Sequence, residues 1–170
     1  VPGETTGFAH TADTSEEGLL AAAEAAAAAA RSAAGGVVTI DLSEERHPHP
    51  SNVIKAPFDI AKGTKVELLT AADSAAREAG SAISQVMARY ADSRRVIQVA
   101  NSDGLLTGDD QTRTLFSVSC VASGDAGMQT GRESIGHTVG FELFDRYDVT
   151  ELARRAAQRA LTNLNPPPAP

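Results

Sequence analysis

The spacing of hydrophobic residues along the chain changes at Gly80. From Thr64 to Ala79 the apolar residues recur at helical spacing, and Gly80 predicts the end of that helix. From Ser81 onward, apolar and polar residues alternate with a period of two, and β-branched residues become common. The predicted strands are residues 83–90, 95–101, 105–107, 112–122 and 129–141.

The centre of this β region is the stretch 94–120. It contains two β-branched runs, 96–100 and 112–122, joined across Asn101-Ser102-Asp103-Gly104. Asn, Asp and Gly tolerate the positive φ of tight turns, so this tetrapeptide predicts a hairpin. Polar or Gly-bearing joints such as residues 91–93 and 123–125 separate most of the other strands. Connections this short force consecutive strands to run antiparallel.

Three helices are predicted, over residues 15–34, 64–79 and 148–164. Each begins at a sequence typical of a capping box, in which a side-chain oxygen accepts from the first free amides. These boxes are Thr14–Glu17, Thr64–Glu67 and Asp148–Glu151. Only two large apolar groups, Leu19 and Leu20, lie on the first helix, so we expect it to lie over a surface rather than through a core.

The fold class that follows is α+β. We expect an antiparallel meander with one face covered by helices 64–79 and 148–164. The first helix is expected to belong to a neighbouring unit, together with short strands at residues 5–10 and 37–42. The residues predicted to lie on the covered face are Val86, Ile97, Val99, Phe116, Val118 and Phe141.

The composition of the chain argues against two classes of partner, nucleic acids and membranes. The formal charge of −7 and the pI near 5.0 give no excess of Lys and Arg to neutralise phosphates, which argues against a nucleic-acid partner. The alanine run near Glu24 is too weakly hydrophobic to span a bilayer, and the N-terminal residues lack a basic signal-peptide region. A single cysteine fits a reducing compartment. We therefore expect a soluble, cytoplasmic protein without a membrane partner.

Candidate metal and nucleophile residues are few. His47 and His49 form an H-x-H pair that could bind a metal, but each precedes a proline and the alternative is a pair of exposed linker histidines. Neither His10 nor His137 has a carboxylate or thiol at a ligand or triad spacing. Cys120 alternates with Phe116 and Val118, which favours a buried strand residue over a nucleophile.

Two loops carry weaker signals. Asp103, Asp109 and Asp110 could form a cation site, although acidic residues near hairpin turns are commonly just solvated. The Gly-rich stretch 124–136 could hold a phosphate through free amides, or could simply connect strands. The H-E-x-x-H, P-loop, G-x-G-x-x-G and G-x-S-x-G motifs are absent from the sequence. We therefore assign no catalytic, cofactor-binding or metal-binding residue.

Three groups of residues, in the same order, resemble the TldD/PmbA family, and its TldD branch more than PmbA (TldE). The first is Gly7-Phe8-Ala9 followed by Thr14–Glu17. The second is the VANSDGLL stretch at 99–106. The third is Met128-Gln129-Thr130-Gly131 with GFELF at 140–144. The resemblance covers nearly the whole chain.

The resemblance implies a zinc metallopeptidase, commonly a TldD–PmbA heterodimer, that cleaves unfolded or short peptides. The family carries its zinc ligands in a C-terminal domain, in a His-Glu-x-x-x-His motif and a further Cys. That motif is absent from this sequence, which ends at the Pro-rich segment 166–170 that precedes it in the family. We therefore expect a fragment of the family's hydrolase. Zinc is expected in the full-length parent, with no cofactor or zinc in the fragment.

The resemblance also implies a domain organisation. Residues 1–57 would be the end of the family's first domain plus a linker, residues 58–165 the middle domain, and residues 166–170 a linker toward the catalytic domain. We expect an inactive segment that supports architecture, pairing with a PmbA/TldE-like subunit or with itself, or peptide access. The alternative is a stand-alone α+β interaction module without a peptidase role. A His-Glu-x-x-x-His motif encoded beyond Pro170 would distinguish the two.

Overall fold

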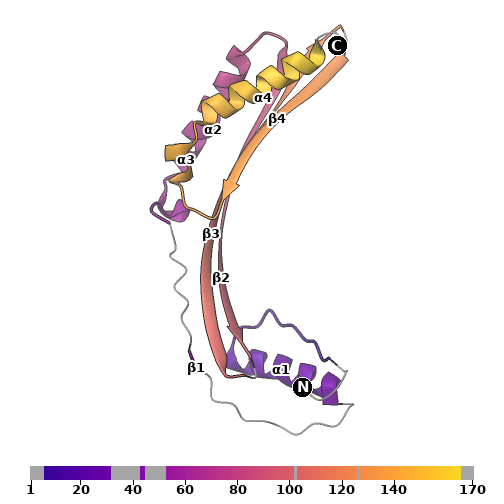
Figure 1. Cartoon of the computed structure of the whole chain (residues 1–170), viewed down its shortest axis with the longest axis vertical. Coiled ribbons are helices and arrows are strands. Elements are labelled where there is room, and N and C mark those ends of the chain that lie inside the picture. Colours follow the sequence, from indigo (N-terminus) through magenta and orange to yellow (C-terminus); the bar gives the residue numbers. More distant parts are fainter. Residues whose placement is uncertain (1–5, 32–42, 45–52, 102, 126, 166–170) are drawn as a thin grey trace. The chain divides into compact units, whose positions relative to one another are not determined.

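The computed structural model describes residues 6–31, 43–44, 53–101, 103–125 and 127–165. The chain divides into two compact units, residues 1–41 and residues 42–170. Both units are drawn in Figure 1, and every strand found among the described residues belongs to the second.

The first unit contains helix α1 (Glu16–Ala30), which is capped one residue later than predicted. Oγ of Ser15 accepts from the amide of Gly18 at 3.1 Å, while Asp13 accepts from the amide of Ser15 at 2.9 Å. The box predicted at Thr14 is therefore wrong, because the Asp13 carboxylate fixes the helix entry. None of the α1 residues is buried. The predicted extension of this helix over residues 32–34 lies outside the described residues.

Residues 6–10 do not form the strand that was predicted there. They lie against α1 instead, where a Cβ added to Gly7 would be 1.8 Å from the carbonyl oxygen of Ala26. A strand needs a paired neighbour, and a helix offers none. The strand predicted at 37–42 lies outside the described residues.

The second unit has the predicted α+β fold (Figure 1). Its long strands are β2 (Ile83–Ala100), β3 (Leu105–Gly124) and β4 (Gly127–His137), which pair antiparallel with β3 in the centre. The short strand β1 (Ser43–Glu44) pairs parallel with Leu105 and Leu106. The predicted turn at 101–104 is confirmed. Gly104 has φ +88°, and Oδ1 of Asn101 accepts from the amides of Asp103 and Leu105.

The strands are fewer and longer than the sequence predicts. The joint predicted at residues 91–93 is wrong, because β2 continues through it with Ala91 opposite Leu115 and Asp92 opposite Thr114. Asp92 instead forms an ion pair with Lys65 at 3.1 Å. The gap predicted at residues 108–111 is likewise part of β3. The polar residues in both stretches therefore lie within strands and do not form turns.

Because β2 continues through residues 91–93, part of the prediction for the covered face is wrong. Side chains alternate between faces, so Ile97 and Val99 lie on the face opposite Val86. Val99 is accordingly 50% exposed. Phe116 and Val118 are fully buried, as predicted, and Val86 packs against the core. Phe141 is buried, but it follows β4 and is not part of it, since β4 ends at His137.

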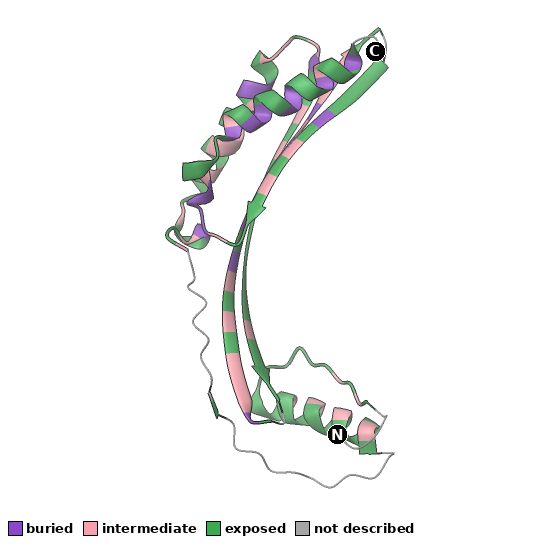
Figure 2. Cartoon of the chain, in the orientation of Figure 1, coloured by how far each residue is buried: buried purple, intermediate pink, exposed green. Residues whose placement is uncertain are grey.

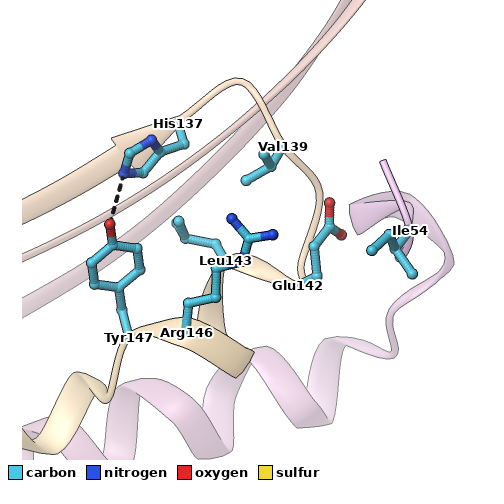
Figure 3. Close-up of a pocket in the computed structure, with 7 residues that line it drawn as sticks. All are labelled: Ile54, His137, Val139, Glu142, Leu143, Arg146 and Tyr147. Carbon is cyan, nitrogen blue, oxygen red and sulfur yellow. Dashed lines mark hydrogen bonds between the residues drawn. The ribbon is translucent and has the colours of Figure 1, made fainter. Parts of the chain in front are cut away.

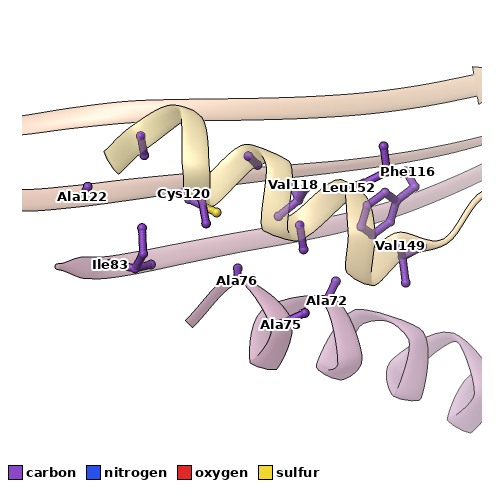
Figure 4. Packing of buried hydrophobic residues seen from close by; sticks show 14 of the residues in the cluster. Ala72, Ala75, Ala76, Ile83, Phe116, Val118, Cys120, Ala122, Val149 and Leu152 are labelled. Atoms are coloured by element: carbon purple, nitrogen blue, oxygen red, sulfur yellow. The ribbon is translucent and has the colours of Figure 1, made fainter. Parts of the chain in front are cut away.

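Helices α2 (Lys62–Glu78) and α4 (Val149–Leu164) cover one face of the sheet (Figures 2 and 4). The capping box predicted at Thr64 is wrong, because α2 begins at Lys62 after Ala61, without a side-chain cap. The predicted cap Asp148 is confirmed and accepts from the amide of Thr150 at 2.8 Å. The core between helices and sheet consists mostly of small residues, namely Ala72, Ala75, Ala76, Cys120, Ala122, Ala153, Ala156, Ala157 and Ala160, and its larger members are Ile83, Phe116, Val118, Val149, Leu152 and Leu164.

Small residues allow α4 to approach the sheet closely. A Cβ added to Gly131 would lie 2.0 Å from the carbonyl oxygen of Ala156. The low aromatic content thus produces a thin core in which helix and strand backbones nearly touch. Within the described residues, no helix is both long and apolar enough to cross a membrane.

Candidate functional site

A pocket of about 310 Å³ opens beside the end of β4 (Figure 3). Two short helices lie near it in sequence, η2 (Pro57–Asp59) and α3 (Leu143–Arg146). The pocket is lined by Ile54, His137, Val139, Glu142, Leu143, Arg146 and Tyr147. Apolar walls with a few polar groups are typical of sites that bind small ligands.

Glu142 joins the two chain segments that form one side of the pocket. One carboxylate oxygen accepts from the amide of Gly140 at 2.8 Å and the other from the amide of Lys55 at 2.9 Å. The amide of Phe141 in turn donates to the carbonyl of Lys55 at 2.7 Å. A side chain at Gly140 would not fit, because its Cβ would lie 2.2 Å from the same carbonyl. Glu142 therefore has a structural role.

The environment of Glu142 favours its charged form. Only 5% of this residue is exposed, and burial acts to raise the carboxyl pKa. The hydrogen bonds from backbone amides outweigh burial, so the net pKa lies below its ordinary value. A carboxylate held ionised in this way is poorly suited to act as a general acid or base near neutral pH.

His137 and Tyr147 form the other wall of the pocket. Their rings stack with centroids 5.6 Å apart and an interplanar angle of 19°, and the Tyr147 hydroxyl lies 3.2 Å from Nε2 of His137 (Figure 3). Arg146 lines the same pocket and makes no ion pair with any other described residue, whereas its neighbour Asp145 pairs with Lys55 at 2.7 Å. The lining contains no Ser, Thr or Cys nucleophile. This arrangement can bind a small polar group but does not form a catalytic triad.

Cys120 lies in the core, as the sequence predicts. Its side chain is fully buried on the helix-covered face of β3 (Figure 4), and burial raises the pKa of the thiol. A protonated, inaccessible thiol is a poor nucleophile. The alternative of a nucleophilic Cys120 therefore has no support in this structure.

The three aspartates considered for a cation site do not converge. Asp109 and Asp110 are adjacent in β3 and point to opposite faces. Asp110 is paired with Arg94, which lowers the pKa of its carboxyl, and Asp109 accepts from Gln111 at 2.5 Å. Asp103 lies in the hairpin turn. The hypothesis of a cation site at these residues is wrong.

The remaining candidates from the sequence fall into three groups. Most of the stretch 124–136 forms the regular strand β4 and not an open Gly-rich loop, so the loop that the phosphate hypothesis requires is not formed there. His10 stacks on Phe8, with ring centroids 6.0 Å apart. His47 and His49 lie outside the described residues, and nothing tests the metal hypothesis for them.

The described residues do not fit a zinc site. Groups of three or more His, Cys, Asp or Glu side chains that could hold a metal do not occur among them. The ring nitrogen of His137 faces Tyr147, and Cys120 is enclosed in the core. Because imidazole and thiolate donors are not brought together, no catalytic step at a zinc ion follows from this part of the chain.

Sequence reasoning missed the pocket at His137. Its polar residues match no motif, and they meet only because the chain leaves β4, reverses at Gly140 and starts α3. The one available signal was the GFELF segment at 140–144, which carries part of the family resemblance. Neither spacing nor residue type indicated a cavity.

Comparison with known proteins gives the chain a family. Residues 55–164 match the family model described as PmbA/TldA metallopeptidase central domain. A protein of Methanothermobacter thermautotrophicus named "Metalloprotease" is 33% identical over 135 residues, which are 78% of this chain and 28% of that protein.

A solved structure supports the fold. A crystal structure from Thermotoga maritima, described as a candidate modulator of a DNA gyrase, superposes with a TM-score of 0.65 at 16% identity. The superposition covers 89% of this chain and 33% of that one. The chain thus spans about a third or less of the relatives it matches. It belongs to the PmbA/TldD metallopeptidase family, and residues 55–164 are that family's central domain.

Proposed function

We propose that this chain is a non-catalytic segment of a TldD-like zinc metallopeptidase that cleaves unfolded or short peptides. In this proposal, residues 1–57 end the family's first domain, residues 58–165 form the middle domain, and residues 166–170 lead toward a catalytic domain that carries the zinc. The segment supports the architecture of the parent enzyme, its pairing with a PmbA/TldE-like subunit or a second copy, or the access of peptides.

The observation that carries the proposal is the match of the family's central domain to residues 55–164. The relative named as a metalloprotease is more than three times as long as the matched part, which leaves room for a separate catalytic domain in that protein.

The test is a peptidase assay on the purified chain with added zinc, using a fluorogenic unfolded peptide as substrate. We expect no turnover above background, and less than one zinc per chain by elemental analysis after removal of free metal. The same assay on the parent protein encoded by the full reading frame should show turnover that a chelator abolishes.

Two results would overturn the proposal. Chelator-sensitive cleavage by the isolated chain would place catalysis within these residues, with His47 and His49 as the first ligands to substitute. A reading frame that lacks a downstream His-Glu-x-x-x-His motif would instead favour a stand-alone interaction module.

A further inference from the structure

The two faces of the sheet differ sharply in how their charges are paired. On the helix side, the acids of β2, β3 and β4 all have cationic partners. Asp92 pairs with Lys65 at 3.1 Å, Asp110 with Arg94 at 2.5 Å, and Glu133 with Arg159 at 2.8 Å. These ion pairs neutralise the strand acids on the face that carries the core.

The opposite face, which we call the open face, carries unpaired arginines. Register and alternation place Arg89, Arg95, Arg113 and Arg132 on it, and all four are exposed. None of the four forms an ion pair with another described residue, and Arg113 makes only a long hydrogen bond of 3.4 Å to Gln111. The one strand acid on this face is Asp109, which accepts from Gln111. A chain of formal charge −7 thus has one face with an excess of positive charge.

The arginines are arranged in two pairs around an apolar centre. Arg95 and Arg113 are diagonal neighbours, since Arg95 lies opposite Gln111. Arg89 lies opposite Ser117, and Arg132 lies opposite Ser119 on the other side of β3. Between the pairs, Leu115 is 43% exposed and lies over Gly136, where an added Cβ would be 3.3 Å from its side chain. The neighbouring charges of Arg95 and Arg113 repel each other unless an anion lies between them, while Arg89 and Arg132 flank β3 on either side.

We propose that the open face binds an acidic polypeptide segment, with carboxylates at both ends of the bound stretch and apolar residues between them. Arginine binds carboxylates through two parallel hydrogen bonds, which suits exposed guanidinium groups on a flat sheet. From Gln111 to Ser119 the register spans about 26 Å at about 3.3 Å per residue, the length of roughly eight extended residues. The assignment does not depend on peptidase activity in the parent protein.

Composition of the open face favours a polypeptide over a nucleic acid. Sheets that bind single-stranded nucleic acids stack bases on aromatic side chains. The described strand residues on the open face include no Phe, Tyr or Trp, because Tyr90 and Phe116 point to the helix side. Leu115 and the 60% exposed Met87 supply apolar contact area of the kind that a peptide side chain uses.

The experiment measures binding of a fluorescein-labelled peptide, Glu-Glu-Ala-Leu-Leu-Ala-Glu-Glu, to the full 170-residue chain by fluorescence anisotropy. The test variant carries Arg89→Gln and Arg113→Gln. The matched control carries Lys62→Gln and Arg154→Gln, which remove the same charge from exposed positions on α2 and α4. Far-UV circular dichroism checks the fold of each protein, and Arg132→Gln serves as a second, single-site test.

We expect the wild-type chain to bind the peptide at about 50 mM salt and to lose most of that binding at about 500 mM salt. The test variant should bind at least about tenfold more weakly, Arg132→Gln about threefold more weakly, and the control within about twofold of wild type. Absence of wild-type binding, or an equal loss in the control, would overturn the proposal. Tighter binding of an eight-nucleotide oligothymidine than of the peptide would overturn it in favour of a phosphate ligand.

Discussion

The two halves of the β2–β3 hairpin share one ladder but differ in burial. In the half nearest α2 and α4, Phe116 and Val118 are fully buried. In the half nearest the turn, Val96 is 71% exposed and Val99 is 50% exposed. Figure 2 shows mainly exposed and intermediate residues along this half of the strands. The pairing register continues without a break between the two halves, from Val86 opposite Cys120 to Ala100 opposite Leu106.

This difference shows that strand propensity and burial are separate properties. Both halves contain β-branched residues at alternating positions, and both form regular strands. Within the second unit, only the covered half gains the free energy of apolar burial under helices, because α2 and α4 pack on it only there. The bare half is held by backbone hydrogen bonds and by the Asn101 turn, since the ion pair between Arg94 and Asp110 is exposed to solvent. We therefore expect the resistance to unfolding to be concentrated in the covered half.

The largest expected effect comes from truncating a core side chain. Phe116→Ala should lower the free energy of unfolding by about 3–5 kcal/mol, because it leaves a cavity beneath Phe144, which packs edge-on against Phe116 with ring centroids 6.3 Å apart. Val96→Ala, in the bare half, should change it by less than about 0.5 kcal/mol. Urea unfolding followed by circular dichroism gives both values, and equal losses would contradict the division of the hairpin.

A methyl group added to the two halves should also have unequal effects. Gly131→Ala would place Cβ 2.0 Å from the α4 backbone, which cannot move without displacing the helix, so a loss of about 2–3 kcal/mol is expected. Gly108→Ala places Cβ 3.3 Å from the carbonyl of Ile97, and this contact needs only a small shift. Thermal unfolding of the pair should show a large decrease in Tm for Gly131→Ala alone. A larger decrease for Gly108→Ala would refute the close approach of α4.

Glu142 and Asp110 both have lowered pKa values, so a buried and an exposed carboxylate can be compared by how the free energy of unfolding changes with pH. The folded state lowers the pKa of Glu142 below its ordinary value, so its contribution is present above the unfolded pKa and is lost as pH falls through the folded pKa. Glu142→Gln should cost about 1–2 kcal/mol at neutral pH, because its amide group would face a backbone N–H. The variant should also lose less stability than wild type between about pH 5 and pH 3.

Asp110→Asn is the matched control in the bare half. Its pKa is lowered by Arg94, but this ion pair is exposed to solvent. We expect no measurable change in the free energy of unfolding and an unchanged acid transition. Urea titrations at a series of pH values test both variants, and an acid transition in Glu142→Gln identical to wild type would refute the role of that carboxylate.

Sequence alone predicted most of the second unit. The α+β class, the turn at Asn101, the cap at Asp148 and the burial of Phe116 follow from local chemistry, and all are present. The resemblance to the TldD/PmbA family is confirmed by the match over residues 55–164. Each of these features depends on residues close in sequence or on a distinctive motif.

Features that depend on distant residues were not predictable in this way. The polar residues around Asp92 resembled a turn, yet they lie in a strand because Thr114 and Lys65 provide cross-strand and ion-pair partners. The predicted break at 91–93 also separated Ile97 and Val99 from the alternation that starts at Val86. Both residues were therefore assigned to the wrong face of the sheet. The pocket at His137 requires the contact between Glu142 and Lys55, which are 87 residues apart.

Amide hydrogen exchange on this chain tests the central claim most directly. If helix packing divides one continuous hairpin into a stable half and a weakly held half, the hydrogen-bonded amides around Phe116 and Val118 should exchange only through global unfolding. Those paired between residues 96–100 and 106–110 should exchange at least about a hundredfold faster, through local opening of the bare half. A single uniform protection along the whole β2–β3 ladder would contradict the account.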